Sequence, residues 1–452
     1  MNPKTTPTWV ILLLCFLALL ADGYDLYVYG ATLPGFLGNP EWGVTKSLAG
    51  TVGSIALVGM LIGSLAAGTL TDRWGRRRLL LASLATFSIG MILCALAPDF
   101  TWFAVFRFLT CLGVGGVLPT AVALANEFAP KGKVSLSVGA VLLGPPVGSL
   151  VGALVASGIV VDHGVRPVYA LGGLSLVLFA AVWFLLPESE VFLAARADRA
   201  VSASDAAASS GRLRSASVRS ASVAPGTRSD QGISGLFATG RLLPTLLLWL
   251  VCLLSMLTMF GLTTWLPVIM QGAGFSTQSS ITFLSVYSLG CIIGTIVIMI
   301  IAQRTAPKYM VVLGFTIAAL ALVLVSATQS PALLFVGIFF AGVGGMGTQN
   351  MINDHIAQFY PPRIRATGLG WALAIGRFGA IAGPVYGGLA ATIGGSPNAA
   401  AVWFAVPAAL GAIVAIIMPL RDRLTSGAAA TPAPAGSTTP DRGPETEKEV
   451  RA

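Results

Sequence analysis

Twelve long apolar runs, separated by shorter polar stretches, determine what this chain can fold into. Each run is near or above the length of about 20 residues that a helix needs to cross a bilayer. The runs cover residues 9–37, 47–70, 79–97, 101–127, 134–160, 167–186, 243–270, 280–302, 309–328, 332–357, 366–391 and 398–420. Only 10% of the 452 residues are charged, whereas a soluble globular protein has about 25%. These features predict an all-α integral membrane protein with twelve transmembrane helices.

Composition also predicts the domain boundaries. Six runs fall in an N-terminal six-helix bundle, residues 1–187, and six in a C-terminal six-helix bundle, residues 241–421. Residues 188–240 are rich in Ser, Ala and Arg, which is typical of a cytoplasmic linker, here with a short interfacial helix near 235–239. Residues 422–452 have the composition of a disordered cytoplasmic tail. Two six-helix halves are a common plan for transporters, whose substrate site lies near the midplane between the halves.

The positions of the lysines and arginines predict the orientation. If the N-terminus is inside the cell, the outer side holds only Lys46 and Arg166, while Arg107 and Arg377 fall inside apolar runs. All other lysines and arginines then fall on the inner side, as the positive-inside rule requires. We therefore expect a multi-pass protein of the cell membrane with both termini in the cytoplasm.

Two carboxylates inside the first apolar run are the main functional signal. Asp22 and Asp25 are three residues apart and share a helix face, which Tyr29 joins one turn later. A charge at that depth costs on the order of 3 kcal/mol on insertion scales and is a functional-site hypothesis by default. One alternative is a structural ion pair that fixes helix packing. We favour function because two carboxylates need more compensation than one structural contact supplies.

Arg107 and Arg377 predict partners for these carboxylates. At about 1.5 Å of rise per residue, both arginines and Asp22 fall in one slab of the membrane, which indicates a shared aqueous cavity. Guanidinium groups bind carboxylates in a forked geometry, and an aspartate can hold a proton. The sequence therefore predicts proton-coupled uptake of an organic anion. One proton per monoanion would be electroneutral and two would be electrogenic; the pair of aspartates leaves both options open.

The positions of three more residues predict that they line the same cavity. Asn350 is expected to line the cavity face of the tenth span. The rings of Tyr29 and Trp265 are candidates for stacking on a substrate ring, with helix packing as the alternative for each. Neither composition nor spacing by itself predicts an aromatic substrate.

The inner loop after the second run carries a dense charged motif. It contains Gly68, Asp72, Arg73, Gly75 and Arg76. Glu127 ends the fourth run at the same face, so we expect it to pair with Arg73, and Arg365 lies at the inner start of the eleventh run. One interpretation is a latch that closes the inner gate when the site faces outward. The alternative is that the arginines only determine topology.

These residues resemble the major facilitator superfamily, whose loop pattern G-x-L-x-D-R-x-G-R-R matches residues 68–78. Within it, the chain is similar to the aromatic acid:proton symporter family. The similarity is carried by the motifs around Asp22, Asp25, Arg107, Trp265, Tyr360, Arg365 and Arg377. It implies uptake of benzoate-like acids, with the family's membrane charges at Asp22, Asp25, Arg107 and Arg377 and its loop residues at Asp72, Glu127 and Arg365. Tyr24 and Leu26 resemble benzoate-type members more than hydroxybenzoate-type members.

Three other classes of protein are alternatives to a proton-coupled uptake carrier. The first is an exporter or antiporter of another organic anion or drug with the same fold, and the second is an aromatic-acid receptor that transports nothing. The third is an enzyme, but the sequence has no nucleophile–base pair, metal cluster or nucleotide-binding loop. No metal or organic cofactor is expected, and the proton is the coupling ion. Although the net charge is +9, no basic–aromatic motif indicates nucleic acid. We expect a monomer whose partners are a small aromatic acid anion, a proton and the lipid bilayer.

Overall fold

A computed structural model describes most of the chain outside the linker and tail. The described residues are 6–130, 132–189, 192–193, 232–237, 240–361, 364–393 and 397–420. The predicted tail, 422–452, lies outside them, and so does most of the predicted linker, 188–240. Within that part of the chain every regular element is a helix, and twelve helical spans are long and apolar enough to cross a membrane. The predicted all-α membrane fold is therefore confirmed.

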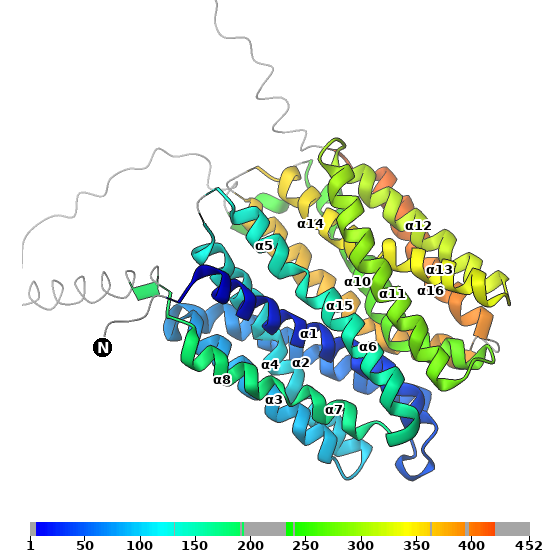
Figure 1. Cartoon of the computed structure of the whole chain (residues 1–452). Helices are drawn as coiled ribbons and strands as arrows, with labels where there is room; N and C mark the ends of the chain where they lie inside the picture. Colours follow the sequence, from blue (N-terminus) through cyan, green and yellow to red (C-terminus); the bar gives the residue numbers. More distant parts are fainter. Residues whose placement is uncertain are drawn as a thin grey trace, which may run out of the picture.

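The first six spans form one side of the molecule (Figure 1). Their helices are α1 (Thr8–Leu37), α2 (Lys46–Trp74), α3 (Arg76–Leu96), α4 (Phe100–Phe128), α5 (Val134–Leu142), α6 (Gly144–His163), α7 (Arg166–Gly172) and α8 (Ser175–Leu185), with the short turn η1 (Pro40–Trp42) after α1. The fifth span is divided between α5 and α6 where Pro145 and Pro146 follow Gly144. Proline has no backbone N–H and cannot continue the hydrogen-bond ladder of a preceding helix, so a new helix begins there.

The last six spans form the other side (Figure 1). Their helices are α10 (Leu242–Gly272), α11 (Thr277–Ala302), α12 (Pro307–Ala327), α13 (Pro331–Val343), α14 (Met346–Phe359), α15 (Arg365–Ile393) and α16 (Pro397–Ile417), preceded by the turn η3 (Gly232–Phe237). The tenth span is divided at Gly344 and Gly345, as the fifth is at its prolines. Where a short interfacial helix is expected near 235–239, the described residues form the short 3₁₀ helix η3, whose Leu236 is fully buried against the C-terminal half, and residues 238 and 239 lie outside the described part of the chain.

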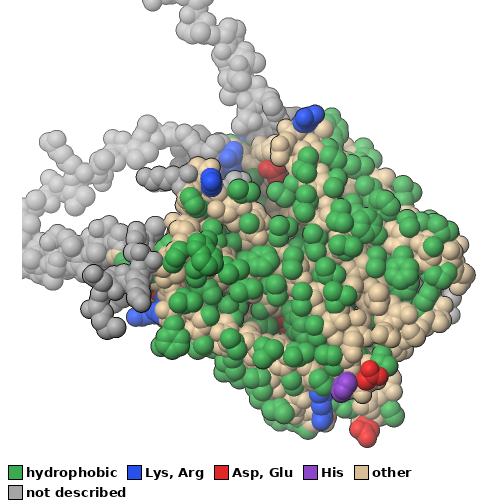
Figure 2. Space-filling view, in the orientation of Figure 1, with side chains coloured by type: hydrophobic (Ala, Val, Ile, Leu, Met, Phe, Trp, Pro, Cys, Tyr) green, Lys and Arg blue, Asp and Glu red, His purple; other side chains and the backbone are tan. Residues whose placement is uncertain are grey.

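The outside of the molecule is apolar along the helices. Large side chains such as Phe184, Val177 and Leu320 are more than 60% exposed, at 81%, 69% and 66%. Figure 2 shows hydrophobic side chains covering the face of the helices, while charged side chains gather at their ends. An apolar surface this extensive is unfavourable in water and fits a hydrocarbon environment.

Glycines allow α1 and α6 to pack with their backbones almost in contact. A Cβ at Gly148 would lie 1.9 Å from the carbonyl oxygen of Leu20, and a Cβ at Gly23 would lie 2.0 Å from that of Pro145. Both distances are far below van der Waals contact. Small residues at such crossings compensate for the absence of a hydrophobic driving force between helices in lipid.

We expect Gly148→Ala to destabilise the protein by about 1–3 kcal/mol, which is the usual cost of overpacking. The matched control is Gly158→Ala in the same helix, because a Cβ at Gly158 meets no atom within 4 Å. The measurement is the thermal melting temperature of each purified variant in detergent. Equal melting temperatures for the two variants would contradict the close crossing of α1 and α6.

The two halves are joined near one end of the molecule. We call the end where α1 begins the inner face and the opposite end the outer face. In the outer part of the bundle, the Ser54 hydroxyl of α2 donates to the Ile381 carbonyl of α15 at 2.5 Å. The Lys46 ammonium donates to the carbonyl of Ala391 at 3.1 Å. These contacts close the outer ends of α2 and α15 together.

The inner ends of the halves are less connected. The inner helices α5 and α14 pack chiefly against helices of their own bundle, whereas the main contacts between the halves join α2 with α15, α6 with α11 and α1 with α10. The described contacts therefore join the two halves more closely toward the outer face than toward the inner face.

Candidate functional site

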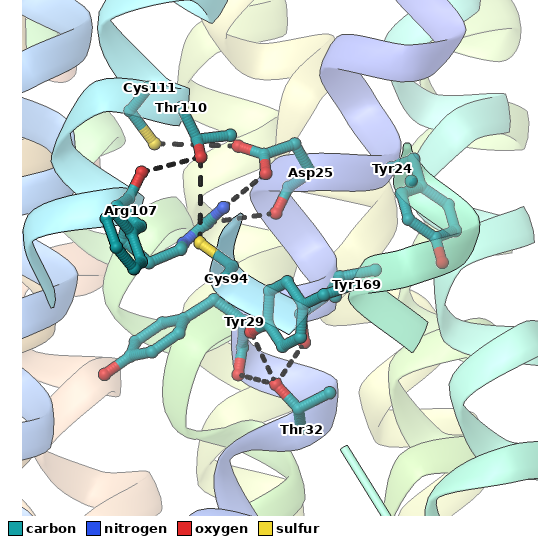
Figure 3. Close-up of polar contacts among 12 residues, drawn as sticks. Tyr24, Asp25, Tyr29, Thr32, Cys94, Arg107, Thr110, Cys111 and Tyr169 are labelled. Atoms are coloured by element: carbon teal, nitrogen blue, oxygen red, sulfur yellow. Dashed lines mark hydrogen bonds and ion pairs between the residues drawn. The ribbon is translucent and has the colours of Figure 1, made fainter. Parts of the chain in front are cut away.

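A buried ion pair joins α1 to α4 in the N-terminal half (Figure 3). Asp25 is fully buried, Arg107 is 2% exposed, and Nη1 of Arg107 contacts Oδ1 of Asp25 directly. Nη2 of Arg107 also donates to the backbone carbonyl of Asp25 at 3.2 Å, and the Cys111 thiol donates to Oδ2 at 3.6 Å. Both carboxylate oxygens of Asp25 therefore have partners.

Aromatic rings hold the arginine of this pair in place. The guanidinium carbon of Arg107 lies 5.7 Å from the ring centroid of Tyr29 and 5.9 Å from that of Tyr169. The Tyr29 hydroxyl donates to the Ala49 carbonyl at 2.6 Å, and the Tyr169 hydroxyl is 2.9 Å from that of Thr32. Cation–π contact of this kind stabilises a desolvated guanidinium by about 2 kcal/mol. Tyr29 thus supports the ion pair, and Tyr169 is a second support that the sequence analysis missed.

Asp22 has a different environment from Asp25. It is 4% exposed, and its Oδ1 has no hydrogen-bond partner among the described residues. Arg377 of α15 and Asp25 are both within electrostatic range of it. Nη1 of Arg377 is 3.1 Å from the Met60 sulfur of α2, so this arginine lies at the boundary between the halves.

The structure thus brings charges from α1, α4 and α15 together, as their common depth predicted. It does not place them in open water: Asp22, Asp25 and Arg107 are all at least 96% buried. The expected aqueous cavity is therefore wrong for these three side chains in this conformation. The physical reason is that the closed outer ends and the aromatic rings around Arg107 cover them.

Trp265 and Asn350 have separate positions. The Trp265 side chain is fully buried, and its Nε1 donates to the Pro384 carbonyl at 2.8 Å, so the ring fastens α10 to α15. Asn350 is exposed on α14. It lies about 200° around the helix from Thr348, which packs against Gly314 of α12. Asn350 therefore points away from α12.

The inner loop forms a cluster within the N-terminal half. Nε of Arg76 is 2.6 Å from Oε1 of Glu127. The expected pairing of Glu127 with Arg73 is therefore wrong. Arg76 begins α3 and lies beside the end of α4, whereas Arg73 is still on α2 and is exposed.

Glu188 is a member of this cluster that the sequence analysis missed. Its Oε1 accepts a hydrogen bond from the backbone N–H of Arg77 at 3.0 Å, at the start of α3. Gly75 has a φ of 90°, and a Cβ there would lie 2.7 Å from Oε2 of Glu188, so the motif needs glycine at this position. The available signal was the acidic residue directly after Pro187 at the end of the sixth span.

The remaining loop residues are less constrained. Gly68 and Arg365 are exposed, and a Cβ at Gly68 would meet no atom within 4 Å. The side chain of Asp72 lies outside the described part of the structure. A latch between the two halves stays a prediction, since the ion pair of Glu127 joins helices of one half. Among the described residues, no group of three or more His, Cys, Asp or Glu side chains is placed to hold a metal ion.

A twelve-span bundle in two six-span halves, with ionisable side chains at membrane depth, is a common plan for membrane transporters. The model of the Major Facilitator Superfamily matches residues 15–384 and 282–446, and the chain belongs to this family. The family and the relatives described next are transporters and not enzymes.

Curated relatives cover most of the chain. A gallate transporter of Pseudomonas putida is 34% identical over 87% of this chain and 88% of the relative. A benzoate transport protein of Acinetobacter baylyi is 32% identical over 86% and 84%. A 4-hydroxybenzoate transporter of the same species is 31% identical over 92% of each.

Solved structures show the same fold at lower identity. A D-xylose–proton symporter is 19% identical with a TM-score of 0.70, covering 91% of this chain and 97% of that one. A nucleoside transporter is 14% identical with a TM-score of 0.70, covering 91% and 99%. The predicted fold and family are therefore confirmed.

Proposed function

We propose that this protein carries an aromatic carboxylate into the cell together with a proton, by alternating exposure of a site between its two halves. The similarity to transporters of gallate, benzoate and 4-hydroxybenzoate supports an aromatic acid as the substrate. The excess of Lys and Arg on the inner side supports a location in the cell membrane with both termini in the cytoplasm.

The observation that carries the proposal is the unequal pairing of the two aspartates. Both oxygens of Asp25 have partners, whereas Oδ1 of Asp22 has none. A carboxylate removed from water is unfavourable unless it is paired or takes up a proton. Asp22 is therefore the proposed proton carrier, and the Asp25–Arg107 pair is the proposed fixed element beside it.

Arg377 is the proposed anchor for the substrate carboxylate. It comes from the opposite half, lies within electrostatic range of Asp22, and is less buried than Arg107. When a substrate carboxylate engages Arg377, the attraction between Arg377 and Asp22 is shared with the substrate. Asp22 then takes up a proton more readily, which couples the anion to the proton.

Two other functions remain to be separated by experiment: export of an organic anion in exchange for protons, and binding without transport. The test uses purified protein in liposomes, with labelled benzoate, 4-hydroxybenzoate and gallate outside and a proton gradient directed inward. We expect accumulation that disappears when a protonophore collapses the gradient. Export driven by the opposite gradient, or binding with no flux, would refute symport. Repeating the assay at an imposed membrane potential separates one proton per anion from two.

A further inference from the structure

The C-terminal half contains a buried hydrogen-bond acceptor that the protein does not satisfy. Oε1 of Gln349 has no hydrogen-bond partner among the described residues, and the side chain is only 5% exposed. An unsatisfied buried polar group costs about 1–3 kcal/mol. Such a group is retained at low cost where a ligand supplies the missing donor.

The same amide is held in one orientation. Its Nε2 donates to Oδ1 of Asn353 at 3.2 Å and to the Cys252 sulfur at 3.5 Å. Asn353 is one helical turn further along α14 and is only partly buried. The Gln349–Asn353 pair therefore lies next to the exposed helix face on which Asn350 stands. With Nε2 used twice, the free oxygen is fixed as an acceptor.

Gln349 also lies close to the segment of α15 that carries the proposed substrate anchor. The Cys252 sulfur that contacts Gln349 lies 2.7 Å from where a Cβ on Gly376 would be, and Gly376 directly precedes Arg377. Arg377 is twelve residues from the inner end of α15 and Gln349 is ten from the inner end of α14. At about 1.5 Å per residue they differ in depth by only about 3 Å.

We propose that Gln349, oriented by Asn353, accepts a hydrogen bond from a ring hydroxyl of the substrate, so that the protein prefers hydroxylated aromatic acids to benzoate. This inference rests on the proposed function and on Arg377 as the carboxylate anchor. A site that forms a hydrogen bond with a substrate hydroxyl discriminates against a substrate without that hydroxyl, because the site's own polar group is then left unpaired. The relatives include transporters of both kinds of acid, so family membership does not decide the preference.

Tyr24, which suggested a benzoate-type substrate, does not face this site. Its hydroxyl donates to the Val168 carbonyl at 2.7 Å within the N-terminal half. Figure 3 shows its ring on the side of α1 away from Arg107. Tyr24 is therefore not placed to contact the substrate ring, whereas Gln349 contacts the Cys252 sulfur that packs against the residue before Arg377.

The experiment compares 4-hydroxybenzoate, 3-hydroxybenzoate and benzoate as substrates of the full-length protein in liposomes. We expect at least one hydroxybenzoate to have a lower KM than benzoate. In Gln349→Met, which keeps the side-chain length but removes the acceptor, the KM of that hydroxybenzoate should rise about 3- to 10-fold, the equivalent of one neutral hydrogen bond. The KM of benzoate should stay unchanged.

The matched control is Gln358→Met on the same helix, whose exposed amide donates to Asp354 near the inner face. It should change neither KM. Equal shifts for both acids in Gln349→Met would indicate a structural role and overturn the inference. A benzoate KM at or below that of both hydroxybenzoates in the unaltered protein would overturn it without any variant. Absence of transport for all three acids would instead refute the proposed function.

Discussion

Replacing Asp22 by asparagine is expected to abolish proton-driven accumulation of the aromatic acid while leaving exchange of acid across the membrane intact. Asparagine keeps the shape of the side chain but cannot take up or release a proton. With one proton per anion and a gradient of about 2 pH units, the unaltered protein should accumulate its substrate about 100-fold, since each factor of ten corresponds to about 1.4 kcal/mol. The variant should reach a ratio of about one.

Two assays on the same liposomes check this expectation. Accumulation of labelled acid under a pH gradient measures coupling, and counterflow at equal pH measures movement of the loaded carrier. We also expect Asp22→Asn to melt at or above the temperature of the unaltered protein, because a buried carboxyl group becomes a neutral amide that carries no charge to desolvate. Full gradient-driven accumulation by Asp22→Asn would show that the proton binds elsewhere.

Replacing Asp25 by asparagine should have a larger structural effect. Asp25 is the direct partner of Arg107, and both are buried, so the variant leaves a guanidinium without a counter-charge. Removing one partner of a buried pair costs about 3–5 kcal/mol. We therefore expect a clear loss of thermal stability together with loss of both accumulation and counterflow.

The control for this second prediction is the double variant Asp25→Asn with Arg107→Met. Removing both charges is often far less destabilising than removing one, because no unpaired ion remains. The double variant should melt above Asp25→Asn yet still fail to transport. If Asp25→Asn melts at the temperature of the unaltered protein, Arg107 has found another partner, and the proposed fixed pair is wrong.

The sequence was sufficient to predict the spans and the charges between them. An apolar run long enough to cross a membrane has few alternative folds, and ionisable residues such as Asp22, Arg107 and Arg377 stand out within such runs. Which aspartate contacts Arg107 was not predictable. Residues three apart on a helix differ by only about 60° in direction, so the choice between Asp22 and Asp25 depends on how α1 is rotated against α4.

Contacts between distant parts of the chain could not be predicted from the sequence either. Glu188 reaches the start of α3 from the end of the sixth span, and nothing in the local pattern of either segment encodes that distance. The sequence offered ring stacking and helix packing for Trp265 and favoured packing, and the contact of its Nε1 with the Pro384 carbonyl in α15 shows packing. Gln349 and Asn350 both carry an amide group, and which of the two is buried depends on the helix face that each occupies.

The outer closure has a consequence for how the protein opens. Ser54 and Lys46 both donate to main-chain carbonyls, and the ion pairs found among the described residues, Arg107 with Asp25 and Arg76 with Glu127, both lie within the N-terminal half. Among the described residues, separating the outer ends therefore breaks no direct ion pair between the halves. Dissolved salt weakens attraction between exposed charges, so the ionic strength of the surroundings should have little influence on how often this side of the carrier opens.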